Sequence, residues 1–428
     1  MSSLLPPEWR QARLSQVSAI RYGLGVPPRA CVDGLPMIRA TNIKRGRIVP
    51  EGLIRIEKSS IPQGRDAVLT PGEIVVVRSG AYTGDSALVT PEWTGSVVGY
   101  DLVVSPDGTV DSAYLAMWLL GDAARVYFGG QRHRSAQPHL NRGQLGNAIV
   151  TFPPLAEQRQ IAAVLSAVQR AIDRQERLIA LTAELKRALM HKLFTEGTPG
   201  ESLHDSEIGP VPSSWRVEPL GEHLLMADYG LSAKGSEIGK IPILRMTNQV
   251  DGHVVPRDLQ FVSVDESQRR KYRLEPGDLL FNRTNSFDLV GRTALFDLSG
   301  EYLFASYLIR LRVRGEMLRP AFLNHYLNWP GAQRRLKGIA TRAVSQSNIS
   351  ASRLRQFLVP VPSFVEQDEV SESLDGVDQV IALHQRRLAA LQDLFRSLLQ
   401  QLMTAQLRVD DLDLSAFEAA AQEPVGAA

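Results

Sequence analysis

The sequence has a single cysteine and no long apolar run. Cys31 on its own excludes an intramolecular disulfide and favours a reducing compartment such as the cytoplasm. No stretch approaches the about 18 consecutive apolar residues of a transmembrane helix. The segment Met1–Trp9 lacks the charged-then-apolar pattern of a secretion signal. We therefore expect a cytoplasmic globular protein, and its 428 residues predict two or three domains.

Known catalytic motifs are also missing. Gly235–Lys240 resembles a phosphate-binding loop, but it is one residue short and is followed by Ile241 instead of Ser or Thr. The sequence has no Asn-Pro-Pro-aromatic run, no glycine-rich nucleotide fingerprint after a predicted strand and no Gly-x-Ser-x-Gly elbow. Its eight histidines show no zinc-ligand spacing. These absences favour a binding protein without catalytic residues, metal or cofactor.

The net charge is only +2, but basic residues are clustered. From 307 to 356, ten Arg or Lys residues accompany one acid, Glu316. From 113 to 154, the only acid is Asp122 and the basic residues are Arg125, Arg132, Arg134 and Arg142. Basic stretches in equivalent parts of both halves indicate a polyanionic partner such as nucleic acid. A solvated surface balanced by acids elsewhere in the fold is the alternative.

The sequence contains a long internal repeat. Trp9-Arg10 recurs as Trp215-Arg216, and Glu157-Gln158 recurs as Glu366-Gln367, so the offset changes only from 206 to 209 residues. Two further matches pair Pro36–Asn42 with Pro242–Asn248 and Pro71–Glu73 with Pro276–Asp278. A period of this length indicates a duplicated domain, not a solenoid. We expect the partner to have two parts as well.

Each copy is predicted to begin with about 150 residues of mixed α and β structure. Turn residues precede short apolar or alternating runs, which is typical of strands. The predicted strands are 74–77, 278–281, 302–304 and 308–313, and the predicted short helices are 112–121 and 319–329.

A long helix follows the globular part of each copy. Seam positions spaced alternately by four and three residues run from Val370 to Leu402, and the aligned positions run from Ile161 to Leu193. Leu178, Leu181 and Leu185 are expected to widen the apolar stripe of the first helix.

We expect these helices to form an antiparallel coiled coil with one globular part at each end. Its length would be roughly 48 Å at 1.5 Å per residue, or about 14 base pairs of B-DNA. Two amphipathic helices packed on their own domains are the alternative. The predicted fold class is α+β, two tandem mixed domains with a pseudo-twofold repeat. The predicted segments are domain 1–153, helix 154–196, linker 197–207, domain 208–362, helix 363–408 and an acidic, disordered tail 409–428.

The junction between each globular part and its helix resembles that of type I restriction-modification specificity (S) subunits. The motif, with Pro-Pro followed by Glu-Gln in the first copy, lies at Phe152–Ile161 and Val361–Val370. Upstream of it, Ser345–Leu354 matches the family pattern, whereas the first copy departs from that pattern. Trp9 and Trp215 match the family's domain openings. The resemblance covers nearly the whole chain except its acidic tail.

The resemblance implies a function. Each globular part would be a target-recognition domain that reads one half of a split double-stranded DNA sequence. The helix pair would set the spacer and dock two modification subunits, which bind S-adenosylmethionine and methylate adenine. A motor-nuclease restriction subunit would complete the complex, and this chain would supply specificity without catalysis. The alternative from another class is a scaffold with two similar lobes whose basic patches bind an acidic protein.

The repeat divides the candidate DNA contacts into shared and divergent residues. Shared residues suit the scaffold or phosphates, and divergent ones suit bases, because the two domains of such a subunit usually read different sequences. The shared candidates are Arg39, Asn42, Arg78, Arg245, Asn248 and Arg283.

The divergent candidates lie in two loop regions. Tyr82 and Asn285 could reach base edges or could form turns. Lys337 suits a phosphate, with a solvated helix face as its alternative. The late basic loops supply candidates for base contacts, namely Arg132, Arg134, Gln137, Arg342 and Gln346.

Overall fold

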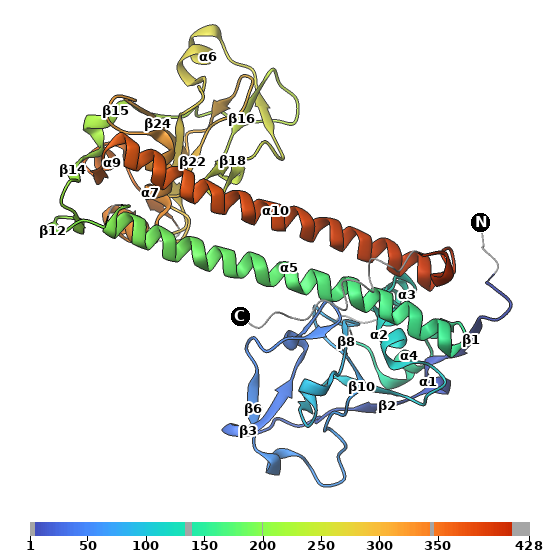
Figure 1. Cartoon of the computed structure of the whole chain (residues 1–428). Helices are drawn as coiled ribbons and strands as arrows, with labels where there is room; N and C mark the ends of the chain where they lie inside the picture. The colour runs from blue at the N-terminus through green and yellow to red at the C-terminus, as the bar shows by residue number, and fades with distance from the viewer. Residues whose placement is uncertain (1–4, 133–138, 199, 343–345, 413–428) are drawn as a thin grey trace. The chain divides into compact units, whose positions relative to one another are not determined.

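The computed structural model describes residues 5–132, 139–198, 200–342 and 346–412, without the side chains of Gln131 and Arg132. Contacts divide the chain into two compact units. Unit 1 combines residues 1–176 with 386–428, and unit 2 comprises residues 177–385. Two long helices, α5 (Leu155–Glu196) and α10 (Phe364–Met403), each contribute residues to both units (Figure 1). Each unit therefore contains one globular domain and part of both helices, and the predicted sequential segments stay a prediction.

The globular domain of unit 1 contains two main sheets. A four-stranded antiparallel sheet has the order β2 (Ser18–Tyr22), β10 (Leu102–Pro106), β7 (Ile74–Val76) and β8 (Ser86–Leu88). A three-stranded sheet has the order β6 (Ile54–Ile56), β3 (Ala30–Ile38) and β9 (Val97–Val98). Two strand pairs complete it, β1 (Arg10–Arg13) with β11 (Ile149–Phe152) and β4 (Ile43–Lys44) with β5 (Arg47–Ile48).

Short helices cover the four-stranded sheet of unit 1. They are α1 (Leu14–Val17), α2 (Ser112–Leu120), α3 (Asp122–Arg132) and α4 (Arg142–Gly146). The Asp111 carboxylate caps α2 by accepting the N–H groups of Ala113 and Tyr114. The alternating residues Ile74, Val76, Leu102 and Val104 face these helices and join one apolar core with them.

Unit 2 repeats this plan with additions. Its six-stranded sheet has the order β15 (Leu224–Tyr229), β24 (Leu308–Val313), β20 (Leu279–Asn282), β22 (Thr293–Leu295), β18 (His253–Val254) and β17 (Gln249–Val250). Two three-stranded sheets have the orders β19 (Gln260–Val262), β16 (Ile241–Leu244), β23 (Leu303–Phe304) and β21 (Thr284–Asn285), β26 (Ser347–Asn348), β25 (Thr341–Arg342). Two strand pairs join β14 (Arg216–Pro219) to β27 (Leu358–Val361) and β12 (Leu203–Ser206) to β13 (Gly209–Pro212). Its helices are α6 (Glu266–Tyr272), α7 (Pro320–Asn328), α8 (Pro330–Ile339) and α9 (Ala351–Arg355).

The predicted mixed α and β structure is confirmed. The expected strands at 74–77, 278–281, 302–304 and 308–313 correspond to β7, β20, β23 and β24, and the two expected short helices are α2 and α7. The residues 235–240, which resembled a phosphate loop, lead into strand β16 and not into a helix. No helix in the described part of the chain has the length and apolar character needed to cross a bilayer.

The two long helices pack against each other in an antiparallel arrangement, as predicted. In unit 1 the early residues Ile161 and Leu165 of α5 share a core with the late residue Leu402 of α10. In unit 2 the late residue Phe194 of α5 shares a core with the early residue Leu374 of α10. Every predicted seam position from 161 to 193 and from 370 to 402 is buried or half-buried. The helices pair with each other, as predicted, and they also pack on the globular domains, as the alternative proposed.

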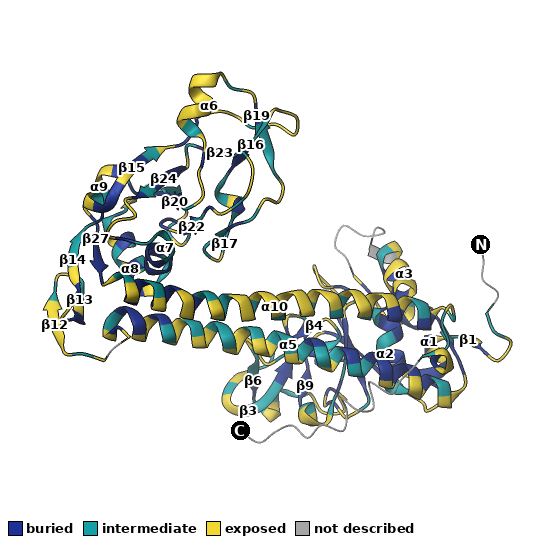
Figure 2. Cartoon of the chain, turned by 45° about the horizontal axis from the view of Figure 1, so that its top comes forward, coloured by how far each residue is buried: buried dark blue, intermediate teal, exposed yellow. Residues whose placement is uncertain are grey.

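The extra leucines of α5 do not join this seam. Leu178, Leu181 and Leu185 are 40%, 50% and 59% exposed, so they widen the apolar stripe of α5 but not its buried part. The partner helix covers only one face, and the seam positions already fill it. Exposed positions accordingly run along both helices in Figure 2.

The glutamine of the recurring Glu-Gln pair connects each long helix to its globular domain by hydrogen bonds. Gln367, which is fully buried, accepts the N–H of Arg319 (2.7 Å) and donates to the carbonyls of Met317 (3.0 Å) and Pro362 (2.9 Å). In unit 1, Gln158 accepts the N–H of Asp111 (2.7 Å) and donates to the Pro153 carbonyl (2.8 Å). Each glutamine therefore joins the start of a long helix to the start of α7 or α2.

The recurring Pro-Gly-acid turn is held by an ion pair between a buried acid and a half-buried arginine. In unit 1, Arg21 on β2 binds Glu73, with 2.9 Å between Nη2 and Oε2. In unit 2, Arg312 on β24 binds Asp278 at 2.7 and 2.8 Å. The acid keeps its place in the repeat, whereas the arginine comes from a different strand. Hydrogen bonding to Asp278 correspondingly raises the pKa of Arg312.

Candidate nucleic-acid interface

An arginine stacks on a tyrosine at the equivalent place in each unit. Arg78 follows β7, and its guanidinium carbon lies 5.3 Å from the centre of the Tyr22 ring. Arg283 follows β20, and its guanidinium carbon lies 4.5 Å from the centre of the Tyr229 ring. These distances are within the range of cation–π contacts. We call each pair an arginine–tyrosine clamp.

Hydrogen bonds fix both partners of each clamp. The hydroxyl of Tyr22 accepts the N–H of Arg142 (3.1 Å), the first residue of α4, and the hydroxyl of Tyr229 accepts the N–H of Ala351 (3.0 Å), the first residue of α9. The backbone carbonyls of Arg78 and Arg283 accept the N–H groups of Leu140 (2.7 Å) and Ile349 (2.9 Å). These bonds fix the tyrosine rings and the main chain of the arginines at the ends of β7 and β20, while both arginine side chains stay only half-buried.

The sequence analysis found the arginines of the clamps and missed the tyrosines. A signal was present, because Tyr-Gly-Leu occurs at 22–24 and again at 229–231. The glycine is required by close packing: a Cβ on Gly23 would lie 2.2 Å from the Gly99 carbonyl oxygen, and one on Gly230 would lie 2.3 Å from that of Ala305. The tripeptide therefore marks both the close backbone approach and the clamp.

The shared asparagines form loops and do not face solvent. Asn42 is fully buried and donates to the carbonyls of Val49 and Glu51 (both 3.1 Å), while its side-chain oxygen accepts the N–H of Arg39 (3.2 Å). Asn248 repeats this pattern with Val255, Arg257 and Arg245. Their amide groups are satisfied inside the protein, which supports the structural alternative for Asn42 and Asn248. A DNA contact by either asparagine stays a prediction.

Arg39 and Arg245 are also partly used by the fold. One Nη2 donates to the Gly52 carbonyl (2.5 Å), and the other donates to the Asp258 carbonyl (2.7 Å). Both side chains are half-buried, so their remaining N–H groups can still donate to a DNA phosphate.

The structure brings together the predicted contacts of unit 2. Strands β21, β26 and β25 form a small sheet that places Asn285 and Arg342 opposite Ser347. The Arg342 guanidinium carbon lies 3.9 Å from the centre of the Phe287 ring, and Lys337 Nζ lies 5.5 Å from it. Gln346 is exposed beside this sheet. Phe287 is thus an aromatic surface lined by two cations, which the sequence analysis did not select.

Fewer of the predicted contacts of unit 1 can be placed. Tyr82 is 51% exposed, in the loop that follows Arg78. Arg132 ends α3, but its side chain is outside the described residues, as are Arg134 and Gln137 altogether. These three residues stay predictions.

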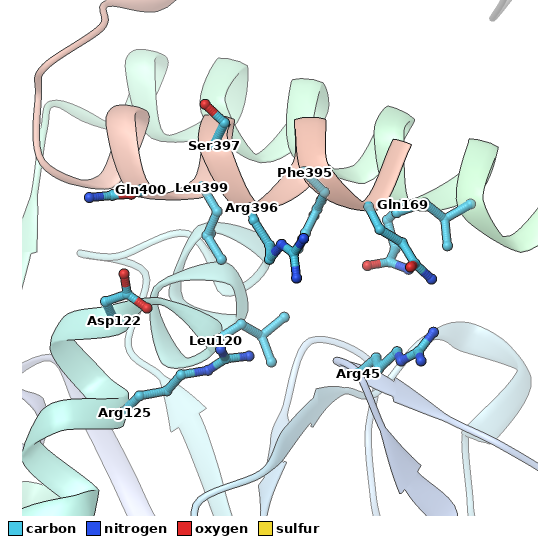
Figure 3. A pocket seen from close by; sticks show the side chains of 12 residues that line it. Arg45, Leu120, Asp122, Arg125, Gln169, Phe395, Arg396, Ser397, Leu399 and Gln400 are labelled. Atoms are coloured by element: carbon cyan, nitrogen blue, oxygen red, sulfur yellow. The ribbon is translucent and has the colours of Figure 1, made fainter. Parts of the chain in front are cut away.

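Each unit also has a basic groove beside the helix pair. In unit 1, apolar residues of α5 and α10 form part of its lining (Figure 3). The lining of the unit 1 groove includes Arg45, Leu120, Asp122, Arg125, Ile172, Phe395, Arg396 and Leu399. The lining of the unit 2 groove includes five basic residues (Lys186, Arg187, Arg292, Arg334 and Lys337), three acids (Asp251, Asp288 and Asp378) and the apolar Met190 and Ile381. Since Lys337 also lies near Phe287, the unit 2 groove adjoins the divergent loops.

One cluster in unit 2 has residue types that could bind a metal. Ligand atoms of His325, Asp375 and Asp378 lie within 4.8 Å of one another. His325 Nε2 is 2.8 Å from Asp375 Oδ1, and Lys186 Nζ is 2.5 and 2.6 Å from the two carboxylate oxygens of Asp378. The hydrogen bond from His325 lowers the pKa of Asp375. Because the lysine ammonium occupies one carboxylate, we interpret the cluster as an ion-pair network that ties α7 and α5 to α10.

Comparison with known proteins identifies a family. The family model described as "Type I restriction modification DNA specificity domain" matches residues 9–183 and 231–393. The specificity subunit of the Escherichia coli (strain K12) type I restriction enzyme EcoKI is 25% identical over 445 residues, covering 97% of this chain and 93% of that protein.

Two solved structures share the fold. The S subunit of a type I restriction-modification system from M. genitalium has a TM-score of 0.61 at 15% identity, covering 94% of this chain and 97% of that chain. A chain solved in a study of complex assembly and conformational transition of the type I R-M system has a TM-score of 0.53 at 21% identity, covering 94% and 100%.

Proposed function

Because the chain belongs to the family of type I restriction-modification DNA specificity domains and carries the family domain twice, we propose that each copy reads one half of a split double-stranded DNA target. The observation that supports this most directly is the pair of arginine–tyrosine clamps, in which the hydrogen bond from the tyrosine hydroxyl to the first residue of a helix recurs while the loops beside the clamps differ. A shared anchor beside a divergent reading surface suits two domains that bind the same polymer at different sequences.

We assign the clamp arginines to contacts with DNA phosphates. Both guanidinium groups stack on a tyrosine, and that of Arg283 also donates to the Ser306 carbonyl. Groups positioned in this way suit a charge-assisted contact. Arg39, Arg245 and Lys337 are further candidates for backbone contacts.

The divergent side chains are assigned to bases. Arg can bind guanine and Asn or Gln can bind adenine through two hydrogen bonds, each such pair contributing about 1–3 kcal/mol of discrimination. Phe287 offers a ring for apolar contact or stacking. The assigned base readers are Tyr82, Arg132, Arg134 and Gln137 in unit 1 and Asn285, Arg342 and Gln346 in unit 2.

We further propose that the helix pair sets the spacer and docks two modification subunits, with a motor-nuclease restriction subunit completing the complex in the cytoplasm. An exposed apolar stripe in unit 2 supports docking. Since the globular domain and partner helix leave this stripe uncovered, another protein can bury it. The stripe comprises Leu178, Leu181, Leu185, Val380 and Leu383, which are 39–59% exposed.

Methylation mapping tests the proposed function. The chain is co-expressed with its modification subunit, and methylated adenines are mapped across the host genome. We expect a motif of two short fixed sequences separated by unspecified bases. A continuous motif would contradict the two-domain reading. Failure of the purified chain to bind any duplex DNA would favour the scaffold alternative.

Lys337→Ala should weaken binding to target and random duplexes alike. Loss of one phosphate contact should reduce the slope of log K against log salt concentration by about one unit. This slope is measured by fluorescence anisotropy with a labelled duplex at KCl concentrations from about 50 to 300 mM. Lys58→Ala, on the surface of unit 1, is the control, and an unchanged slope for Lys337→Ala would remove that lysine from the interface.

Leu181→Ser combined with Leu383→Ser should reduce the affinity for the modification subunit by about tenfold or more. Each half-exposed leucine can still bury enough apolar surface to contribute about 1 kcal/mol. Analytical ultracentrifugation measures the complex, and binding of the isolated chain to DNA should be unchanged. Leu203→Ser is the matched control, because Leu203 is 46% exposed on β12, outside the stripe. Equal affinity for the double variant and the parent would exclude the stripe as a docking surface.

A further inference from the structure

The two clamps differ in one charged neighbour. In unit 1, the carboxylate of Asp101 accepts the backbone N–H of Arg78 (3.2 Å), and the charge of Arg78 acts on it. Asp101 is only 5% exposed. In unit 2, the backbone N–H of Arg283 instead donates to the backbone carbonyl of Tyr307 (3.1 Å), whose side chain is 51% exposed.

The residue of unit 2 that is equivalent to Asp101 is the apolar Leu308. Tyr22 of the first clamp pairs with Leu102, the residue after Asp101, and Tyr229 of the second clamp pairs with Ile309, the residue after Leu308. The N–H of Gly23 likewise donates to the Asp101 carbonyl, and the N–H of Gly230 donates to the Leu308 carbonyl. The difference in charge therefore falls on one position of the repeat.

Within the described residues, no ion pair joins the side chain of Arg283 to an acid. Its guanidinium donates to the Ser306 carbonyl (3.3 Å) and stacks on Tyr229. The side chain of Arg78 is not in an ion pair within the described residues either, but the Asp101 carboxylate lies 3.2 Å from its backbone nitrogen and interacts with its charge.

We propose that Asp101 weakens the hold of the unit 1 clamp on DNA phosphate, so that unit 2 supplies the larger share of sequence-independent DNA affinity. This inference rests on the proposed function. A buried carboxylate is screened little by water or salt, so it offsets the field of the adjacent guanidinium and repels an approaching phosphate. The carboxylate of Asp101 also accepts a hydrogen bond from the Arg78 backbone, so this residue helps to position the clamp although its charge opposes phosphate binding.

The charge of Asp101 is best tested at alkaline pH. Burial raises the pKa of this carboxyl, although the N–H groups of Arg78 and Ala40 and the charge of Arg78 oppose that effect. Working at about pH 8 favours the carboxylate over the protonated acid.

The experiment compares Asp101→Asn with the parent chain. The amide oxygen can still accept the Arg78 N–H, so the variant removes charge and keeps the clamp. Binding to a labelled random-sequence duplex of about 30 base pairs is measured by anisotropy at low and high KCl. We expect roughly three- to tenfold tighter binding at low salt and a smaller difference at high salt, because phosphate contacts weaken as salt rises.

A reciprocal pair of variants adds a charge to the unit 2 clamp at Tyr307, whose carbonyl accepts the N–H of Arg283. Tyr307→Asp should bind the random duplex more weakly than Tyr307→Asn, since both variants lose the ring and only the first gains a carboxylate beside Arg283. Circular dichroism of all variants confirms folding. Equal affinities for Asp101→Asn and the parent would overturn the inference, as would equal affinities within the reciprocal pair. Absence of DNA binding by the parent chain would instead overturn the proposed function.

Discussion

A variant without both clamp arginines, Arg78→Ala with Arg283→Ala, is expected to bind DNA about a hundredfold more weakly than the parent. A hydrogen bond to a charged group contributes about 1.5 kcal/mol or more, and two such losses amount to about two factors of ten in affinity. Anisotropy with both a target duplex and a random duplex measures the effect. The loss should be similar on both duplexes, because phosphate contacts carry no sequence information.

Matched variants separate the clamp from general charge. Arg159→Ala with Arg270→Ala removes the same number of arginines from sites where the side chains are 72% and 80% exposed. This control should keep most of the affinity. A loss confined to the target duplex would make the clamp arginines base readers. Parent-like affinity for the clamp variant would remove them from the interface.

Gln367→Leu should lower the free energy of unfolding of unit 2 by about 2–4 kcal/mol. Leucine has a similar size but makes no hydrogen bond. The N–H of Arg319 and the carbonyls of Met317 and Pro362 would then be buried without a partner, at about 1–3 kcal/mol for each unsatisfied group before relaxation. Urea denaturation followed by circular dichroism measures the loss.

The two units provide internal controls for this experiment. Gln158→Leu should destabilise unit 1 instead, because Gln158 makes the equivalent contacts there. Gln385→Leu, at an exposed position of the same helix, should change stability by less than about 0.5 kcal/mol. If Gln367→Leu and Gln158→Leu both unfolded like the parent, the glutamines of the motif would have no structural role and their recurrence would need another explanation.

The seam of the long helices could be predicted because it depends on local periodicity. Apolar residues spaced by four and three must lie on one face of a helix, whatever surrounds it. The exposure of Leu181 and Leu185 could not be predicted in the same way. These residues lie beside the seam, and their burial depends on which surfaces the partner helix and the globular domain cover.

The candidate interface shows the same division. Arg78 and Arg283 follow strands in both copies, which selected them from the sequence alone. Asn42 and Asn248 were equally well matched, yet their amides are used inside their own loops. Recurrence in a repeat marks a shared requirement, and it does not distinguish a structural requirement from a binding one.

By itself, the sequence determined that the chain is duplicated, that each copy joins a mixed α and β domain to a long helix, and that the junctions resemble one family. These properties follow from residue order, spacing and periodicity. Only the tertiary structure decided which side chains meet: Tyr22 with Arg78, Gln367 with the start of α7, and Asp101 with one clamp but not the other. Such contacts join residues tens of positions apart, and their geometry is set by strand pairing and packing that no local pattern encodes.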